Sequence, residues 1–305
     1  MSGLHYCVFA LPEDTLLSLF ESWLVLKGVV RLDSAICNRS MRPSYLEVLG
    51  KCPLQSRKYN GYLVDEYIRW RASRYLKNLD NLVVRKASES FVGNSTHAAD
   101  VLVEVKNLFI YHSDDDNTTR WLELVAPMFQ NLSEFVSMGL RFADIDWIPL
   151  LGRNENLQTL SMHFEYKGKL LPDSMLYHFR NCQELKMVRL SNYCCNGVES
   201  ILSNNTNLIE LMLDSCNSMT DETFTLILNL PYVQRIDLCG NNMVVGDGAL
   251  NITTTTLRFL SLAYFHRLTE DNLLRILAAL PNKPIVDLRL AYMKRITAAT
   301  ADRCE

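Results

Sequence analysis

The chain has 305 residues, of which 48% are hydrophobic and 21% charged, and its formal net charge is −3. These values are typical of a soluble protein that can bury a sizeable core. They argue against nucleic acid as a main partner, because a phosphate backbone calls for an excess of Lys and Arg. No apolar run in the sequence reaches the ~18 residues that span a membrane, so we expect no membrane partner.

The first eleven residues are mildly apolar but lack the basic start of a signal peptide, so we expect a protein of the cytoplasm or nucleus. The sequence contains nine cysteines, an odd number, and no C-x-x-C motif. This pattern favours free thiols over disulfides and argues against a zinc site.

Residues 8–50 predict three helices. The first spans 13–24, after Pro12, which suits a first-turn position. The second spans 29–38, after Gly28, and the third spans 43–49 and ends at Gly50. On the first helix, helical periodicity places five apolar side chains on one face: Leu16, Leu17, Phe20, Trp23 and Leu24.

This order of helices resembles an F-box. Residues 11–14, Leu-Pro-Glu-Asp, stand where the family opens with Leu-Pro, and residues 34–38, Ser-Ala-Ile-Cys-Asn, stand at its Val-Cys-Arg/Lys stretch. Trp23 departs from the family pattern, and Met41 and Arg42 stand where a Trp is usual.

The resemblance implies docking to a Skp-type linker protein of a cullin ubiquitin ligase. The contacts would come from Leu11, Pro12, Leu16 and Leu17, as an apolar helical patch against a groove. The alternative is that these helices only cap the first unit of the fold that comes after them.

Residues 51–78 predict a connecting helix that leads into the first strand. Its faces mix aromatic and basic side chains: Tyr67, Trp70, Arg71, Arg74 and Tyr75. A nucleic-acid contact is the alternative role for this cluster, but Asp65, Glu66 and Asp80 offset its charge.

The rest of the chain repeats one pattern: apolar, two variable residues, apolar, one variable residue, apolar. Successive copies from residue 157 start 23 to 28 residues apart, within the 20–29 of leucine-rich repeats. The copies are Leu157/Leu160/Met162, Leu185/Val188/Leu190, Leu208/Leu211/Leu213, Val233/Ile236/Leu238, Leu257/Leu260/Leu262 and Ile285/Leu288/Leu290.

The best copy, residues 211–221, resembles the cysteine-containing subclass of these repeats, in which a strand is followed by Cys and then by Thr-Asp at a helix start. Cys216 takes the Cys position, and Thr220 or Asp221 can cap the helix. Residues 268–271, Leu-Thr-Glu-Asp, repeat this helix start. The equivalents of Cys216 are Tyr193, Asn241, Phe265 and Met293, of which Asn241 also fits the family pattern.

Weaker copies begin at Leu79 and Val105, and a third begins at Leu132 but decays at Ser137. We therefore predict an α/β leucine-rich-repeat solenoid of about nine repeats over 79–305. Its parallel strands would line the concave face and its helices the convex face, after the small all-α module. A doubly wound α/β domain is the alternative. One interior row of leucines is expected, formed by Leu160, Leu190, Leu213, Leu238, Leu262 and Leu290.

Residues that alternate with the pattern residues should point to the concave face. There we expect a protein-binding surface made of Arg189, Glu210, Met212, Asp214, Arg235, Asp237, Phe259 and Arg289, with Met212 and Phe259 as apolar anchors. Parallel pairing would place Glu210 beside Arg235. The alternative is that these opposite charges pair only to keep the sheet soluble.

Motifs for catalysis are absent from the sequence: it has no phosphate-binding loop, dinucleotide fingerprint, nucleophile elbow or metal-binding helix. The acidic run Asp114 to Asp116 and the adjacent Cys194 and Cys195 are better explained as a solvated loop and structural thiols. We therefore expect no catalytic residue, metal or cofactor. The predicted function is a non-catalytic adaptor that holds a protein target on the concave face, or a stand-alone binding scaffold.

Overall fold

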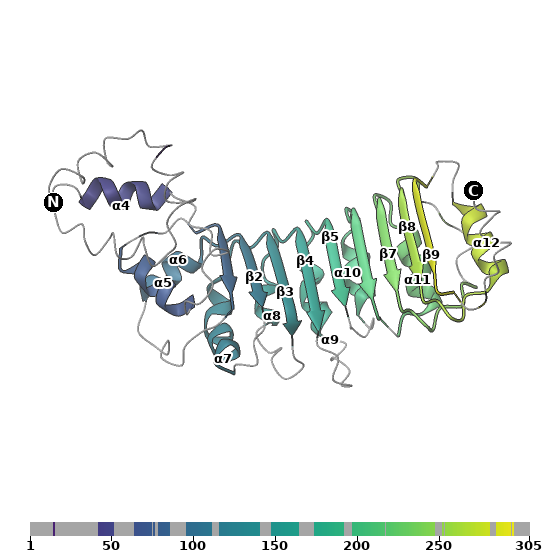
Figure 1. Ribbon diagram of the computed structural model, residues 1–305, viewed down its shortest axis with the longest axis horizontal. Helices are drawn as coiled ribbons and strands as arrows, with labels where there is room; N and C mark the ends of the chain where they lie inside the picture. The colour runs from purple at the N-terminus through teal and green to yellow at the C-terminus, as the bar shows by residue number, and fades with distance from the viewer. Residues whose placement is uncertain are drawn as a thin grey trace. The chain divides into compact units, whose positions relative to one another are not determined.

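The computed structural model describes residues 15, 42–51, 64–74, 76, 79–85, 96–111, 116–140, 148–164, 174–191, 197–216, 218–247, 252, 254–280, 285–293 and 295. The chain divides into two compact units, residues 1–132 and 133–305. In both units most of the strands are followed by a helix (Figure 1).

The first unit contains strands β1 (Asn81–Val84) and β2 (Asn107–Tyr111), which pair in parallel. Its helices are α4 (Arg42–Lys51), α5 (Val64–Ala72), α6 (Thr96–Leu102) and α7 (Asp116–Val125), followed by the 3₁₀ helix η3 (Ala126–Met128). The third helix predicted from the sequence is therefore present as α4, but it continues through Gly50 to Lys51. The first two predicted helices lie outside the described residues, apart from Thr15.

Helix α5 is the predicted connecting helix, and it places one of its basic residues inside the protein. Arg71 is fully buried. Its Nε donates to the carbonyl oxygen of Leu76 at 3.1 Å, and its Nη1 donates to the hydroxyl of Tyr67 at 3.2 Å. A buried guanidinium is stable only when its donors are satisfied, so Arg71 holds the end of α5 and is not part of a basic surface.

None of the helices in the described ranges is both long and apolar enough to cross a membrane.

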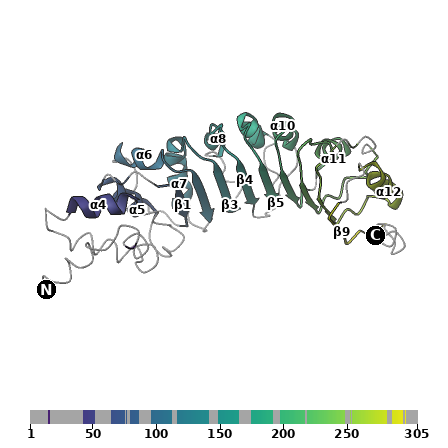
Figure 2. The same cartoon turned by 90° about the horizontal axis from the view of Figure 1, so that it is seen from above.

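The second unit contains seven strands that pair in parallel in chain order. They are β3 (Glu134–Leu140), β4 (Thr159–Phe164), β5 (Met187–Ser191), β6 (Glu210–Asp214), β7 (Arg235–Cys239), β8 (Phe259–Ala263) and β9 (Asp287–Ala291). The helices are α8 (Ile148–Leu151), α9 (Ser174–Tyr177), η5 (His178–Asn181), α10 (Val198–Asn204), α11 (Asp221–Leu228) and α12 (Glu270–Ala279). Figure 2 shows α8, α10, α11 and α12 on one side of these strands, as the solenoid prediction requires.

The predicted apolar pattern forms the interior between strands and helices. Two rows run across β4–β9, and every member up to β8 is at most 1% exposed. The predicted single leucine row needs one correction: Leu160 pairs with Val188, so it lies in the neighbouring row, and Met162 takes its place beside Leu190. On β9, Leu288 and Leu290 are only half-buried. Each unit thus buries its apolar face against the next, which is how a solenoid builds a continuous core.

The repeat copy that loses its apolar pattern at Ser137 still forms a strand of the sheet. Ser137 pairs with Met162 and is fully buried in the interior row, and its hydroxyl has no hydrogen-bond partner among the described residues. Strand β3 therefore keeps the repeat geometry with a polar side chain in an apolar position.

Threonine caps begin the two most regular helices. The hydroxyl of Thr220 accepts from the backbone N–H of Thr223 at 3.2 Å, and that of Thr269 accepts from the N–H of Asn272 at 3.3 Å. Of the two residues predicted to cap α11, Thr220 does so. Asp221 instead accepts from two backbone N–H groups of the following loop, those of Val245 at 2.9 Å and Gly246 at 2.8 Å.

Strands β6 to β9 each end in the same left-handed turn. The residues are Ser215, Gly240, Tyr264 and Tyr292, with φ between 55° and 71°. The N–H of each of the first three donates to the last residue of the next strand, at Cys239, Ala263 and Ala291, over 2.7–2.9 Å. This conformation suits Gly240 and is strained by roughly 1–2 kcal/mol for residues with a Cβ, so the pair of tyrosines is unusual.

Candidate protein-binding face

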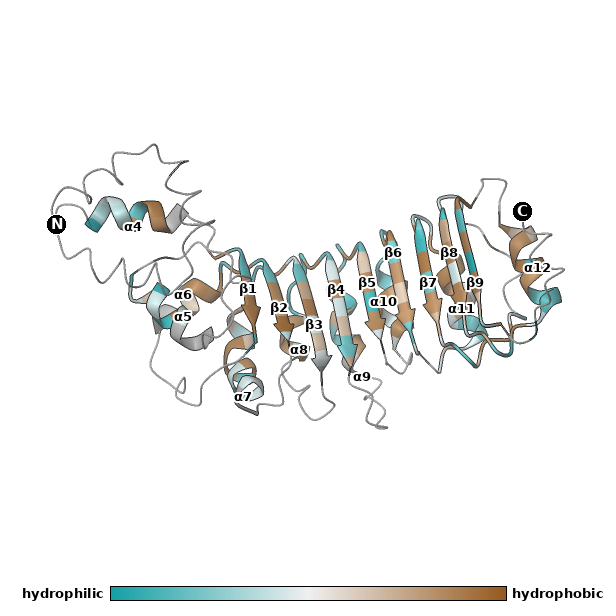
Figure 3. Cartoon of the chain, viewed as in Figure 1, coloured by the Kyte–Doolittle hydropathy of each residue, from teal (hydrophilic) through white to brown (hydrophobic). Residues whose placement is uncertain are grey.

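The sheet face opposite the helices, called the open face here, is formed on β4–β9 by the residues that alternate with the buried rows. On β4 to β7 these residues are exposed or half-buried while their neighbours are buried. In Figure 3 the same strands alternate between hydrophobic and hydrophilic residues, whereas β1 and β2 are hydrophobic over most of their length. From β4 to β7 the open face is thus polar and accessible.

A ladder of opposite charges crosses the open face from β5 to β7. Glu210 accepts from Arg189 at 2.8 Å and lies 3.7 Å from the Nε of Arg235, with which it is paired in register. Arg235 also contacts Asp237 at 3.4 Å. The neighbouring position of Glu210 and Arg235 confirms the pairing predicted from sequence. Pairs this exposed contribute only about 0–1 kcal/mol each to folding, so the ladder is not there chiefly for stability.

Phe259, one of the two expected apolar anchors, is covered by cations. The guanidinium carbons of Arg235 and Arg289 lie 3.7 Å and 4.9 Å from its ring centroid, and only 8% of Phe259 is exposed. Arg289 is held by Asp287, which accepts from its Nε at 3.2 Å and its Nη2 at 2.9 Å. Hydrogen bonding to Asp287 also raises the pKa of Arg289. The ring therefore presents two guanidinium groups in place of an apolar surface.

The sequence-predicted open-face residues are brought together on one surface, with different exposures. Arg189, Asp214 and Arg289 are exposed, and Glu210, Met212, Arg235 and Asp237 are half-buried. The four residues assigned to linker binding, Leu11, Pro12, Leu16 and Leu17, lie outside the described residues.

A rim of the open face that sequence reasoning missed lies where β6–β9 end (Figure 1). The rings of Tyr264 and Tyr292 stack with centroids 4.5 Å apart and an interplanar angle of 11°. Tyr264 is 40% and Tyr292 71% exposed. Burial, followed by the neighbouring Tyr292 phenol and Cys239 thiol, raises the pKa of Tyr264. The sequence signal was available: tyrosine follows the strand at the same place in two successive repeats.

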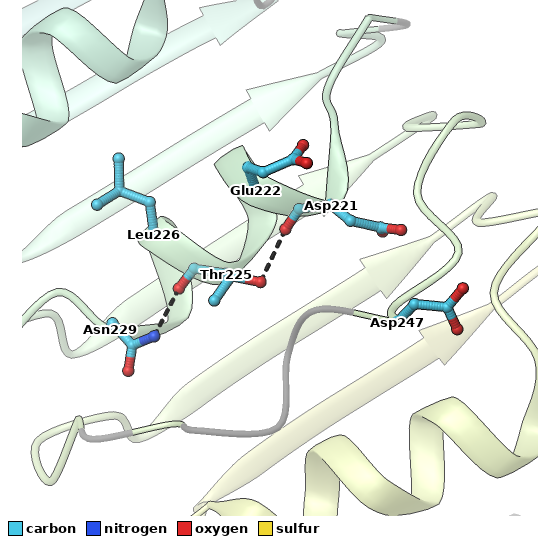
Figure 4. Close-up of a pocket in the computed structure, with 6 residues that line it drawn as sticks. All are labelled: Asp221, Glu222, Thr225, Leu226, Asn229 and Asp247. Carbon is cyan, nitrogen blue, oxygen red and sulfur yellow. Dashed lines mark hydrogen bonds between the residues drawn. The ribbon is translucent and has the colours of Figure 1, made fainter.

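A recess on the helix side of the sheet is lined by Asp221, Glu222, Thr225, Leu226, Asn229 and Asp247 (Figure 4). Its carboxylates are already used within the fold. Asp221 accepts from the loop N–H groups, and Asp247 accepts from the amide of Asn272 at 2.8 Å. Thr225 and Asn229 donate to backbone carbonyls of the same helix. The recess is therefore a structural junction between α11 and the loop after β7.

The described cysteines are free thiols with little nucleophilic character. Cys182 and Cys216 are buried and Cys239 is half-buried. Burial raises the pKa of Cys182 to about 12, and burial together with Asp214 raises the pKa of Cys239 to about 12. Within the described ranges, no three His, Cys, Asp or Glu side chains form a group that could hold a metal ion. Asp114, Asp115, Cys194 and Cys195 lie outside those ranges.

Comparison with known proteins identifies no family. No family model matches the chain, and no curated protein matches it. Among solved structures it is similar to one described as the crystal structure of the Rad7 and Elc1 complex in yeast, with 13% identity over 99% of this chain and 86% of the other, and a TM-score of 0.48. This similarity is too low to transfer properties from that protein, so the function of this chain has to be inferred from its own residues.

Proposed function

We propose that this chain is a non-catalytic protein-binding solenoid that holds a protein target on the open face of β4–β9. The observation that supports this most directly is the charge ladder on neighbouring strands, in which Glu210 is in register with Arg235 and forms a diagonal ion pair with Arg189. Such a fixed array contributes little to stability and offers both donors and acceptors to a partner. A rigid, accessible, mixed-charge sheet is suited to recognising another folded protein.

The charge pattern distinguishes a protein target from a long polyanion. The arginines of the open face lie beside carboxylates. Arg235 pairs with Glu210 and Asp237, and Arg289 pairs with Asp287. A nucleic-acid site needs uniform Lys and Arg to neutralise phosphates, and these carboxylates would repel the backbone. No nucleic acid is therefore part of the proposal.

The finer proposal is that the chain is a substrate adaptor of a cullin ubiquitin ligase in the cytoplasm or nucleus. Residues 8–50, which resemble an F-box, would bind a Skp-type linker through Leu11, Pro12, Leu16 and Leu17. The support is the sequence resemblance together with its third helix, which is present as α4.

A capping role for the N-terminal helices is the second candidate. It is favoured by the burial of the first unit's strands on both faces: Val83 and Phe109 alternate with the interior residues Leu82 and Leu108, yet they are only 9% and 8% exposed. In this case the chain is a stand-alone binding scaffold.

Target binding on the open face is tested by site-specific photo-crosslinking in cells. Met212→p-benzoylphenylalanine places the probe at the centre of the open face, and Arg275→p-benzoylphenylalanine places it on the exposed side of α12. We expect a discrete crosslinked protein from the Met212 position and none from Arg275. Crosslinking that is equal at both positions, or absent from the open face, contradicts the proposal.

The linker proposal is tested by a pull-down of the full chain with a purified Skp-type linker. Leu16→Asp and Leu17→Asp together should abolish binding, because an apolar groove rejects carboxylates. The matched control is Leu124→Asp on α7, where the leucine is already 46% exposed. Failure of the wild-type chain to bind, with its circular dichroism intact, favours the capping role.

A further inference from the structure

The stacked tyrosines at the rim differ in one respect from two other aromatic rings of the sheet, those of Phe259 and Tyr111. Phe259 lies under Arg235 and Arg289, and Tyr111 lies 5.0 Å from the guanidinium carbon of Arg85. Among the described residues, no cation lies over Tyr264 or Tyr292. The nearest ring partner besides the pair itself is His266, edge-on to Tyr264 at 6.2 Å and 82°. The rim thus offers aromatic surface of the kind that elsewhere in this protein stacks on arginine.

Asp214 supplies an uncompensated carboxylate near these rings. It is exposed at the end of β6 and accepts from the hydroxyl of Ser215 at 3.1 Å. It is in register with Cys239, whose pKa it helps to raise, and Cys239 is in register with Ala263, the residue before Tyr264. Among the described residues, no Lys or Arg forms an ion pair with Asp214. Carboxylate, thiol and phenol therefore follow one another across β6, β7 and β8.

Gly240 holds the position between the carboxylate and the ring, where a Cβ would lie 3.1 Å from the Cα of Ser215. It holds the equivalent position to Ser215 and Tyr264, because the three left-handed residues make the same hydrogen bond to the next strand. Gly240 has no side chain and lies between Ser215 and Tyr264 in this row. Asp214 and Tyr264 are two strands apart, roughly 10 Å at the usual strand spacing. A planar group stacked on the ring and hydrogen-bonded to the carboxylate would lie above Gly240, where no side chain projects.

The backbone of the two rim tyrosines is strained. Tyr264 and Tyr292 adopt φ of 58° and 55°, a region that bulky residues rarely occupy, while the preceding repeat uses glycine there. Tyr264 is 40% and Tyr292 71% exposed, so core burial offsets this strain only in part. Strain kept at an exposed aromatic pair is typical of a binding surface.

From these observations we propose that the rim formed by Asp214, Gly240 and Tyr264 binds an arginine side chain of the protein target. The guanidinium stacks on the ring of Tyr264 and donates to the carboxylate of Asp214. Arrangements of this kind already exist within the chain, where Arg235 lies over Phe259 and contacts Asp237. Arginine fits better than lysine because its planar group stacks and donates at once. This inference rests on the proposed target-binding function and assigns a chemistry to one part of it.

The test is selection of a phage-displayed random 12-residue peptide library on the full chain, with binding of the selected peptides measured by fluorescence anisotropy. We expect the selected peptides to share an arginine whose replacement by lysine weakens binding about tenfold. Asp214→Asn and Tyr264→Ala should each weaken binding to a similar degree, whereas Tyr264→Phe, which keeps the ring, should not. Tyr232→Ala is the control, since Tyr232 is 56% exposed outside the rim.

The outcomes separate this inference from the proposed function. In one outcome the selected peptides compete with the open-face crosslink and yet require no arginine, or bind the Asp214→Asn variant as tightly as the wild type. Either result overturns the arginine site, while target binding on the open face still stands. Peptides that bind without competing with that crosslink, or the absence of any selected peptide, overturn the arginine site as well. The proposed function is overturned if the probe at position 212 forms no crosslink.

Discussion

Asp221 ties two successive repeats together, and its removal should loosen the loop after β7. Its carboxylate accepts from the N–H groups of Val245 and Gly246 at 2.9 Å and 2.8 Å. Hydrogen bonds to a charged acceptor contribute about 1.5–3 kcal/mol when well shielded, and Asp221 is half-buried. For Asp221→Ala we therefore expect a loss of about 2–3 kcal/mol in the local free energy of opening. Asp221→Asn keeps an acceptor and should lose about 1 kcal/mol.

Native-state hydrogen exchange measures this directly, because the two N–H groups report on their own loop. A loss of 2–3 kcal/mol corresponds to a fall in protection of roughly 30- to 150-fold at Val245 and Gly246. Glu222→Gln is the matched control: it removes the same charge from the same helical turn, one residue away, and the protection of both amides should be unchanged. If Asp221→Ala leaves that protection intact, or Glu222→Gln lowers it equally, the carboxylate does not hold the loop.

Three further outcomes are expected. Gly152→Ala should lower the melting temperature, because a Cβ there would lie 2.4 Å from the carbonyl oxygen of His178; an unchanged thermal transition by circular dichroism would show that the two repeats can separate. Arg71→Ala should destabilise the first unit by about 2–4 kcal/mol in urea unfolding, since it removes the hydrogen bonds of the guanidinium to the hydroxyl of Tyr67 and to the carbonyl oxygen of Leu76; a smaller loss than for Tyr67→Phe would refute this. Burial raises the pKa of Cys182 to about 12, so the folded state binds the extra proton between pH 9 and 12 and the free energy of unfolding should fall with rising pH over that window. Cys182→Ala should make this slope shallower in pH-dependent urea unfolding without removing it, because the pKa of Cys239 is also raised to about 12; an unchanged slope would contradict the role of Cys182.

The repeat fold was predictable because its signal is redundant. The pattern residues recur in register, and a single exception such as Ser137 is carried by its neighbours, since β3 pairs with β4 in one register from Glu134 to Met138. Helix starts were predictable for a local reason: Thr220 and Thr269 each precede acidic residues at the position where an orphan N–H must be capped.

The details of the open face were less predictable, because they depend on contacts between repeats. Sequence spacing placed Phe259 on the open face but could not show that Arg235 and Arg289, on the two adjacent strands, cover its ring. The role of Asp221 depends on a loop 24 residues away. The backbone conformation of Tyr264 was not predictable either. Its residue type does not indicate a positive φ, which follows from the hydrogen bond of its N–H to Ala291.

The recurring left-handed turn has a consequence for how this chain can be altered. Because Ser215, Gly240 and Tyr264 leave their strands by the same conformation and the same hydrogen bond, the joints after β6, β7 and β8 are geometrically interchangeable. Segments that begin one residue beyond each joint could be exchanged or lengthened without shifting the strand register. The chain is therefore suited to recombination, in which new loops are spliced in while the sheet that carries the target stays as it is.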